Sequence, residues 1–224
     1  MTRRIAVASE TPVFAHLWGV PARIAPVRRD TDLRRMGDDR LDSMHRSKVR
    51  ATREDYERLP EHVKAELIDG EIVVTAAPSD WHETLVARLM IRLCADLGAR
   101  APDLLRGSHT EVSAWEQGEE KILQPDAVVF PEGTRPTGRD WKAPIPVWVA
   151  EVLSPSTAKR DRGVKIRLYG AAGVREAWLV DPDAETIEVF DLAAKRSRVF
   201  AKGERAASKA IPGFGVDIAG LFAV

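Results

Sequence analysis

The sequence places one carboxylate inside an apolar run that is typical of a buried β-strand. Residues 146–153, PVWVAEVL, are apolar and rich in β-branched side chains, and Glu151 is their only charged residue. Strands that are covered on both faces have this composition. Because an unpaired buried charge is costly, we expect Glu151 to have a cation, a metal ion or a bound proton as its partner. The structural alternative is a buried pair of Glu151 with an arginine.

A second carboxylate lies in similar surroundings. Asp126 begins the apolar run AVVF within LQPDAVVF. If the two strands are neighbours in a sheet, Asp126 and Glu151 converge. Without a cation they would repel each other and one of the two pKa values would rise. With a hard divalent cation the same pair becomes a ligand set, since Mg²⁺ prefers oxygen donors.

Several motifs resemble, in their order, one bacterial protein family. Pro125-Asp126, followed 25 residues later by Glu151, is similar to the PD-(D/E)XK signature of restriction-endonuclease-like nucleases. Within that superfamily, the chain resembles the Uma-type bacterial family over about residues 51–224. The segments that carry this resemblance are ELIDGEIV (66–73), LQPDAVVF (123–130), VAEVLSPST (149–157), DRGVKIRLYGAAGV (161–174), EAWLVDP (176–182) and IPGF (211–214).

The resemblance implies a Mg²⁺- or Mn²⁺-dependent endonuclease that hydrolyses phosphodiester bonds in DNA. Asp126, Glu151 and the backbone carbonyl of Val152 would hold the metal ion. The lysine of the superfamily would lie two positions after Glu151, where this chain has Leu153. In the family, the cationic role is transferred to the following helix, where Lys165 is the matching residue.

Lys165 also has a structural interpretation, as the partner of Asp161 at i−4 on a solvated helix face. Residue usage favours the catalytic role, because 25 of the 34 basic residues are arginine. Where the chain needs only positive charge it uses arginine, whereas nuclease chemistry prefers a compact ammonium group.

Two further residues are weaker candidates. Glu66 begins the family-like ELIDGEIV segment and is a candidate third acidic metal ligand, or else a surface carboxylate opposite a basic side chain. His82 lies in the first turn of a predicted helix. It is either a site residue or a histidine that caps or packs this helix.

The elements around these residues predict an α/β protein. Asp69-Gly70 indicates a tight hairpin between two short strands. Residues 80–97 have an amphipathic helical pattern, with Cys94 expected as a buried thiol. KILQPDAVVF is expected as one strand, and a second helix is expected at about residues 158–172. The fold class is therefore a restriction-endonuclease-like mixed β-sheet flanked by helices (αβββαβ), with extra strands.

Composition limits the remaining classes of protein. The net charge is zero, but residues 1–50 carry +5 and residues 51–224 carry −5. Residues 1–50 are expected to form a basic, loosely ordered extension, and residues 51–224 the nuclease domain. No membrane span, phosphate-binding loop or dinucleotide fingerprint is present. The expected location is the cytoplasm and the expected partner is DNA, with RNA and a homodimer left open.

The alternative function is a catalytically inactive nuclease-fold module that binds nucleic acid or protein. Leu153 and the acidic body favour it, because nucleases usually present a basic groove to the phosphate backbone. The buried charge of Glu151 opposes it. The sequence does not reveal the target sequence or the biological pathway.

Overall fold

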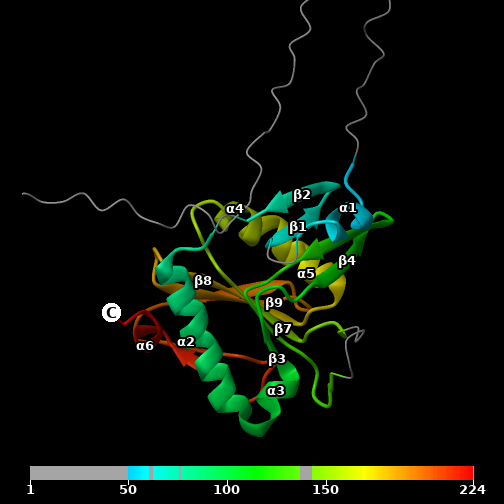
Figure 1. Ribbon diagram of the computed structural model, residues 1–224. Helices are drawn as coiled ribbons and strands as arrows, with labels where there is room; N and C mark the ends of the chain where they lie inside the picture. The colour runs from blue at the N-terminus through cyan, green and yellow to red at the C-terminus, as the bar shows by residue number, and fades with distance from the viewer. Residues whose placement is uncertain (1–49, 61–62, 76, 137–142, 224) are drawn as a thin grey trace, which may run out of the picture. The chain divides into compact units, whose positions relative to one another are not determined.

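A computed structural model describes residues 50–60, 63–75, 77–136 and 143–223 (Figure 1). The helices are α1 (Arg53–Glu57), α2 (Asp80–Leu97), α3 (Ala101–Leu104), α4 (Ala158–Arg160), α5 (Ile166–Ala172) and α6 (Ile218–Phe222), with a 3₁₀ turn η1 (Gly98–Arg100) and a π-helical turn η2 (Asp161–Lys165). The strands are β1 (Ala65–Ile68), β2 (Glu71–Val74), β3 (Leu105–Gly107), β4 (Val112–Glu116), β5 (Glu119–Leu123), β6 (Ala127–Val129), β7 (Trp148–Val152), β8 (Glu176–Asp181), β9 (Thr186–Asp191), β10 (Arg196–Phe200), β11 (Arg205–Ala207) and β12 (Gly215–Asp217). The predicted extension lies outside these residues, apart from Arg50. None of the described helices has the length and apolar character that a bilayer span requires.

The largest sheet has six strands in the order β10-β9-β8-β7-β6-β3. Its central pair, β7 and β8, is parallel, and the other neighbours are antiparallel. A parallel pair needs a crossover connection, and here the chain from α4 through η2 to α5 provides it. This mixed sheet flanked by helices confirms the predicted fold class.

Helices cover both faces of the six-stranded sheet, α4 and α5 on one side and α2 and α6 on the other (Figure 1). Along β7 successive side chains alternate between the faces. Trp148 and Ala150 pack in the core cluster that contains the leucine stripe of α2, whereas Val149 packs in the cluster that contains Leu168 and Tyr169 of α5. Glu151 shares the face of Val149, so it points toward α5 and η2.

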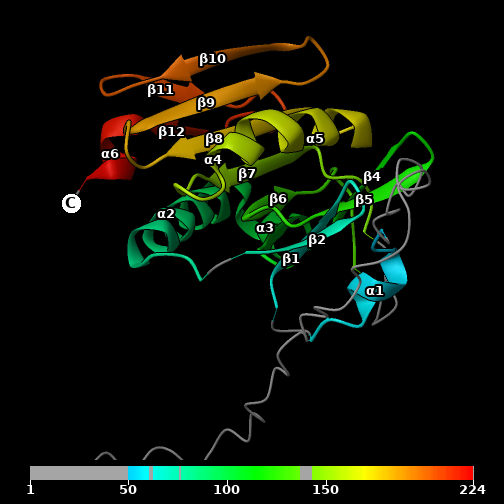
Figure 2. The same cartoon turned by 90° about the horizontal axis from the view of Figure 1, so that it is seen from above.

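A second, four-stranded sheet has the order β2-β1-β5-β4 (Figure 2). The predicted hairpin is confirmed, since β1 and β2 pair antiparallel around Asp69 and Gly70. Both turn residues have positive φ, 52° and 74°. This conformation characterises the type I′ turn, for which Asp-Gly is a preferred dipeptide.

The expectation of one continuous strand over KILQPDAVVF is wrong. Residues 119–123 form β5 in the four-stranded sheet, and residues 127–129 form β6 in the six-stranded sheet. The chain crosses between the sheets at Gln124, Pro125 and Asp126. Proline has no N–H to donate to a strand ladder, so the ladder of β5 ends before it. The crossing places Asp126 at the start of β6, where its N–H donates to the carbonyl of Ala150 at 3.0 Å.

The predicted helix over residues 80–97 is confirmed as α2, and Ser79 caps it by accepting a hydrogen bond from the His82 N–H. The expectation that Cys94 is buried is wrong, because this side chain is exposed. Only the stripe of Leu85, Leu89, Leu93 and Leu97 is buried on this helix. The apolar face is therefore narrower than the sequence pattern indicates.

Candidate active site

Three elements converge on the Asp126 carboxylate. Its Oδ1 accepts a hydrogen bond from Nζ of Lys64 at 2.6 Å. Its Oδ2 accepts one from the Val152 N–H of β7 at 2.9 Å and lies 3.2 Å from Nε2 of His82, on α2. Burial alone would raise the pKa of Asp126, but His82 and Lys64 outweigh burial and hold this pKa well below its ordinary value. Asp126 is therefore an ionised, fixed carboxylate at neutral pH.

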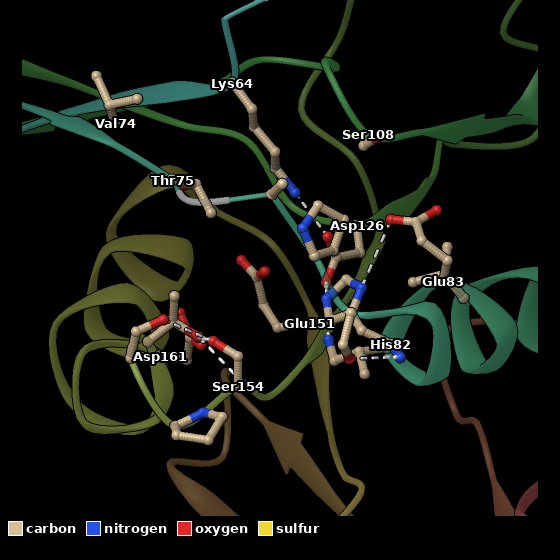
Figure 3. Close-up of a pocket in the computed structure, with 18 of the residues that line it drawn as sticks. Lys64, Val74, Thr75, His82, Glu83, Ser108, Asp126, Glu151, Ser154 and Asp161 are labelled. Atoms are coloured by element: carbon tan, nitrogen blue, oxygen red, sulfur yellow. Dashed lines mark hydrogen bonds and ion pairs between the residues drawn. The ribbon is translucent and has the colours of Figure 1, made fainter. Parts of the chain in front are cut away.

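Glu151 is the second buried carboxylate. Its Oε1 accepts hydrogen bonds from Nζ of Lys165 at 2.8 Å and from the hydroxyl of Tyr169. Burial raises the pKa of Glu151 to about 8, opposed by the positive charge of Lys165 and reinforced by Asp126 and other nearby carboxylates. Oε2 makes no hydrogen bond to any described residue, and Figure 3 shows this carboxylate directed into a cavity. The purely structural alternative, a pair with an arginine, is wrong, since the partner is a lysine.

Lys165 lies among three carboxylates. Its Nζ is 2.8 Å from Glu151, 2.9 Å from Glu66 and 3.1 Å from Asp161. The predicted ion pair with Asp161 is present, but the Lys165 side chain is only 6% exposed. The alternative of a pair on a solvated helix face is therefore wrong. Burial lowers the pKa of Lys165, but the surrounding carboxylates raise it above its ordinary value. Lys165 is therefore a permanent cation.

Asp161 and Lys165 lie at the two ends of the π-helical turn η2, and both are buried. Such turns occur mostly as single insertions within α-helices and are frequent at functional sites. Both side chains lie on the side of η2 that faces Glu151.

The two weaker candidates have different positions. Glu66 is buried, so its interpretation as a surface carboxylate is wrong, and its Oε1 accepts a hydrogen bond from the N–H of Gln124 at 3.2 Å. It contacts Lys165 but is not part of the cavity wall. His82 is part of that wall. Burial lowers the pKa of His82, but the hydrogen bond with Asp126 and the charge of that carboxylate outweigh burial. The net pKa of His82 is therefore above its ordinary value.

The cavity in front of these residues has a volume of about 800 Å³. Asp126, Glu151 and Lys165 form part of its wall, together with the start of α2, the segment Ser108–His109 and the segment 154–157 (Figure 3). Ligand pockets commonly enclose about 300–1,000 Å³. The cavity is therefore large enough for a nucleotide-sized group to reach both carboxylates.

The donor set fits a divalent cation by charge and by chemistry. Four buried carboxylates (Glu66, Asp126, Glu151 and Asp161) face two ammonium groups (Lys64 and Lys165). When all four carboxylates are ionised and His82 is neutral, the difference is two negative charges, which one divalent cation would balance. Carboxylate oxygens are the ligands that Mg²⁺ and Mn²⁺ prefer. Within the described ranges, however, no group of three or more His, Cys, Asp or Glu side chains is arranged to hold a metal ion, so a bound ion would need waters or backbone oxygens as further ligands.

Lys64 is the residue of this site that the sequence analysis missed. It lies just before β1 and its ammonium group reaches Asp126, which is 62 positions further along the chain. The only local signal was its position two residues before the ELIDGEIV segment.

The fold and the site define the class of protein. A mixed sheet flanked by helices has an aspartate directly before β6, a glutamate within β7 and a lysine on the crossover that follows, the arrangement that the resemblance to the Uma-type family implies. The chain belongs to the family Uma2, described as "Putative restriction endonuclease", whose model matches residues 53–219.

The chain is also similar to two individual proteins. An uncharacterised protein of Synechocystis sp. is 28% identical over 135 residues, which cover 59% of this chain and 75% of that protein. The crystal structure of "a putative nuclease belonging to DUF820" from Anabaena variabilis is similar with a TM-score of 0.60 and 22% identity, over 76% of this chain and 97% of the other. At that identity the likeness shows the fold. Family and fold together support a nuclease.

Proposed function

We propose that this protein is a divalent-metal-dependent endonuclease that hydrolyses phosphodiester bonds in DNA. The observation that carries the proposal is the pair of buried carboxylates, Asp126 and Glu151, which face one cavity and belong to a site that has an excess of two negative charges when all its carboxylates are ionised. A structural strand has no use for such an excess, because buried charge destabilises a fold unless it is balanced.

Asp126 and Glu151 would hold Mg²⁺ or Mn²⁺, and we propose the carbonyl of Val152 as a further ligand. When bound, the metal would supply an acidified water and a Lewis acid at the phosphoryl oxygen. The remaining residues of the site orient these ligands. The Val152 N–H and His82 fix the Asp126 carboxylate, and Lys165 and Tyr169 fix the Glu151 carboxylate. Such partners of metal ligands set both geometry and affinity.

An inactive nuclease-fold module is the second candidate function. Leu153 is buried at the position of the superfamily lysine, and the ammonium group of Lys165 is already surrounded by three carboxylates. Both observations remove a cation from direct contact with substrate. This candidate predicts that nucleic acid binds without being cut.

Metal titration and cleavage together test the proposal. Calorimetry should detect Mn²⁺ binding to the wild type and an affinity at least tenfold lower for Asp126→Asn. Replacing even a residue that only supports a metal ligand typically lowers metal affinity about 10–100-fold. Asp183→Asn, an exposed turn residue, is the matched control and should bind like the wild type. Plasmid DNA should be cut by the wild type and by Asp183→Asn, and not by Asp126→Asn. Metal binding without cleavage of DNA or RNA in Mg²⁺ or Mn²⁺ would favour the inactive module.

A further inference from the structure

Lys165 is enclosed by carboxylates. Its Nζ donates a hydrogen bond to Glu151 at 2.8 Å and lies at ion-pair distance from Glu66 and Asp161, at 2.9 and 3.1 Å. The side chain is 6% exposed. A direct contact with a phosphate would require Lys165 to leave at least one buried carboxylate, which is costly. Lys165 is therefore placed to orient the Glu151 carboxylate and not to contact a reacting group.

Lys64 is more accessible than Lys165. Its side chain is 23% exposed, against 6% for Lys165, and both side chains form part of the cavity wall. Its Nζ contacts one carboxylate oxygen, Oδ1 of Asp126 at 2.6 Å. With three donors on the ammonium group, this contact leaves N–H groups for a second acceptor. Figure 3 shows Lys64 extending across the cavity toward Asp126.

The main chain around Lys64 is held in place. Its carbonyl accepts a hydrogen bond from the Thr75 N–H at 3.0 Å, which extends the pairing of β1 and β2 by one step. The contact with Asp126 fixes the other end of the side chain. A donor that is fixed before substrate binds needs little reorganisation in the transition state, which is the condition for effective electrostatic stabilisation.

The geometry points to Lys64 as the catalytic lysine that contacts the scissile phosphate, in the role that the family resemblance implies for Lys165. This inference rests on the proposed function. In the hydrolysis, a water oxygen forms a bond to phosphorus, and the bond to the leaving oxygen breaks with its electron pair. The water releases a proton to solvent and the leaving oxygen takes one from solvent. Lys64 keeps its protons and donates a hydrogen bond to a non-bridging oxygen, whose negative charge increases in the transition state.

Lys64→Gln tests this role, with Lys202→Gln as the matched control on an exposed turn. We expect kcat for DNA cleavage to fall by about 10²–10³ for Lys64→Gln, as for other single transition-state donors, with a small change in KM. Lys64→Arg should restore part of the rate because it keeps the charge. In binding experiments with EDTA present, the salt slope of log K should decrease by about 0.9 for Lys64→Gln, the value for one lost phosphate contact on duplex DNA.

Footprinting of the wild type needs no substitution. Acetylation of Lys64 should slow at least about threefold when DNA saturates the protein in EDTA, whereas that of the exposed Lys202 should not change. A Lys64 that stays equally reactive overturns the inference even if Lys64→Gln does not fold. A wild type that cuts no nucleic acid overturns both the proposed function and this role. A wild type that cuts no faster than a folded Lys64→Gln overturns this role alone.

Discussion

Replacing Lys165 by methionine should destabilise the protein strongly, because it removes the only cation that contacts Glu66, Glu151 and Asp161 together within the described residues. Methionine is similar in length, so loss of packing is small. Removing one partner of a buried ion pair costs about 3–5 kcal/mol. For a chain of this size, 1 kcal/mol changes Tm by about 2–4 °C. We therefore expect Tm to fall by roughly 6–20 °C in thermal unfolding followed by circular dichroism.

The loss should grow with pH. A carboxyl group whose pKa is raised by folding contributes stability below its unfolded pKa and loses it as the pH rises through its folded pKa. For Glu151 of the wild type this interval extends from 4.5 to about 8. Without the Lys165 ammonium group the folded pKa of Glu151 rises further, so the variant and the wild type lose stability alike up to about pH 8, and above that pH only the variant continues to lose it.

The control is Lys202→Met, which removes an exposed lysine and should leave Tm within about 1 °C of the wild type. A fall below about 3 °C for Lys165→Met, equal below and above about pH 8, would refute the reasoning. It would mean that the three carboxylates are protonated or solvated and do not depend on the ammonium group.

Three further predictions concern buried polar groups. His82→Gln should lower the free energy of unfolding by about 1.5–3 kcal/mol near pH 6. The raised pKa of His82 gives stability that is present below its unfolded pKa of 6.5 and lost as the pH rises through its folded pKa. Urea unfolding at several pH values should therefore show a difference from the wild type that becomes smaller at alkaline pH. Glu176→Gln should cost about 1–3 kcal/mol, since both carboxylate oxygens accept hydrogen bonds, from the Trp178 indole and from the N–H groups of Lys209 and Ala210; hydrogen exchange should accelerate at those two amides, and an unchanged rate would contradict the prediction. Leu153→Lys should lower stability by several kcal/mol without raising the cleavage rate, because the side chain at this position is buried; faster cleavage would show that the lost superfamily lysine matters.

The strand that carries Glu151 could be predicted because its signal is local. An apolar, β-branched run with one charge specifies a covered strand, and β7 extends over Trp148–Val152 as expected. The Asp-Gly hairpin was predictable for the same reason, since its turn geometry depends on two adjacent residues. The motif order also identified Lys165, although its burial among three carboxylates depends on elements far apart in the chain.

Lys64 could not be predicted because its contact depends on how two sheets meet. Nothing in the residues around position 64 indicates that the chain between β5 and β6 will pass beside it. The π-helical turn η2 had no sequence signal either, because its residues also suit an ordinary α-helix. Cys94 was misassigned for a related reason, since α2 buries only its leucine stripe.

The crossing of the chain between the two sheets at Gln124–Asp126 has a consequence for the order of folding. The contacts of Asp126 with Lys64 and with the Val152 N–H close intervals of 62 and 26 residues, so they require both sheets to be in place. Contacts of large sequence separation form late, because loop closure is entropically unfavourable until other interactions reward it. Helix α2 can gain structure from local contacts well before then. In a refolding experiment, recovery of metal binding should therefore lag behind the recovery of helical signal, and the site should be among the last parts of the molecule to form.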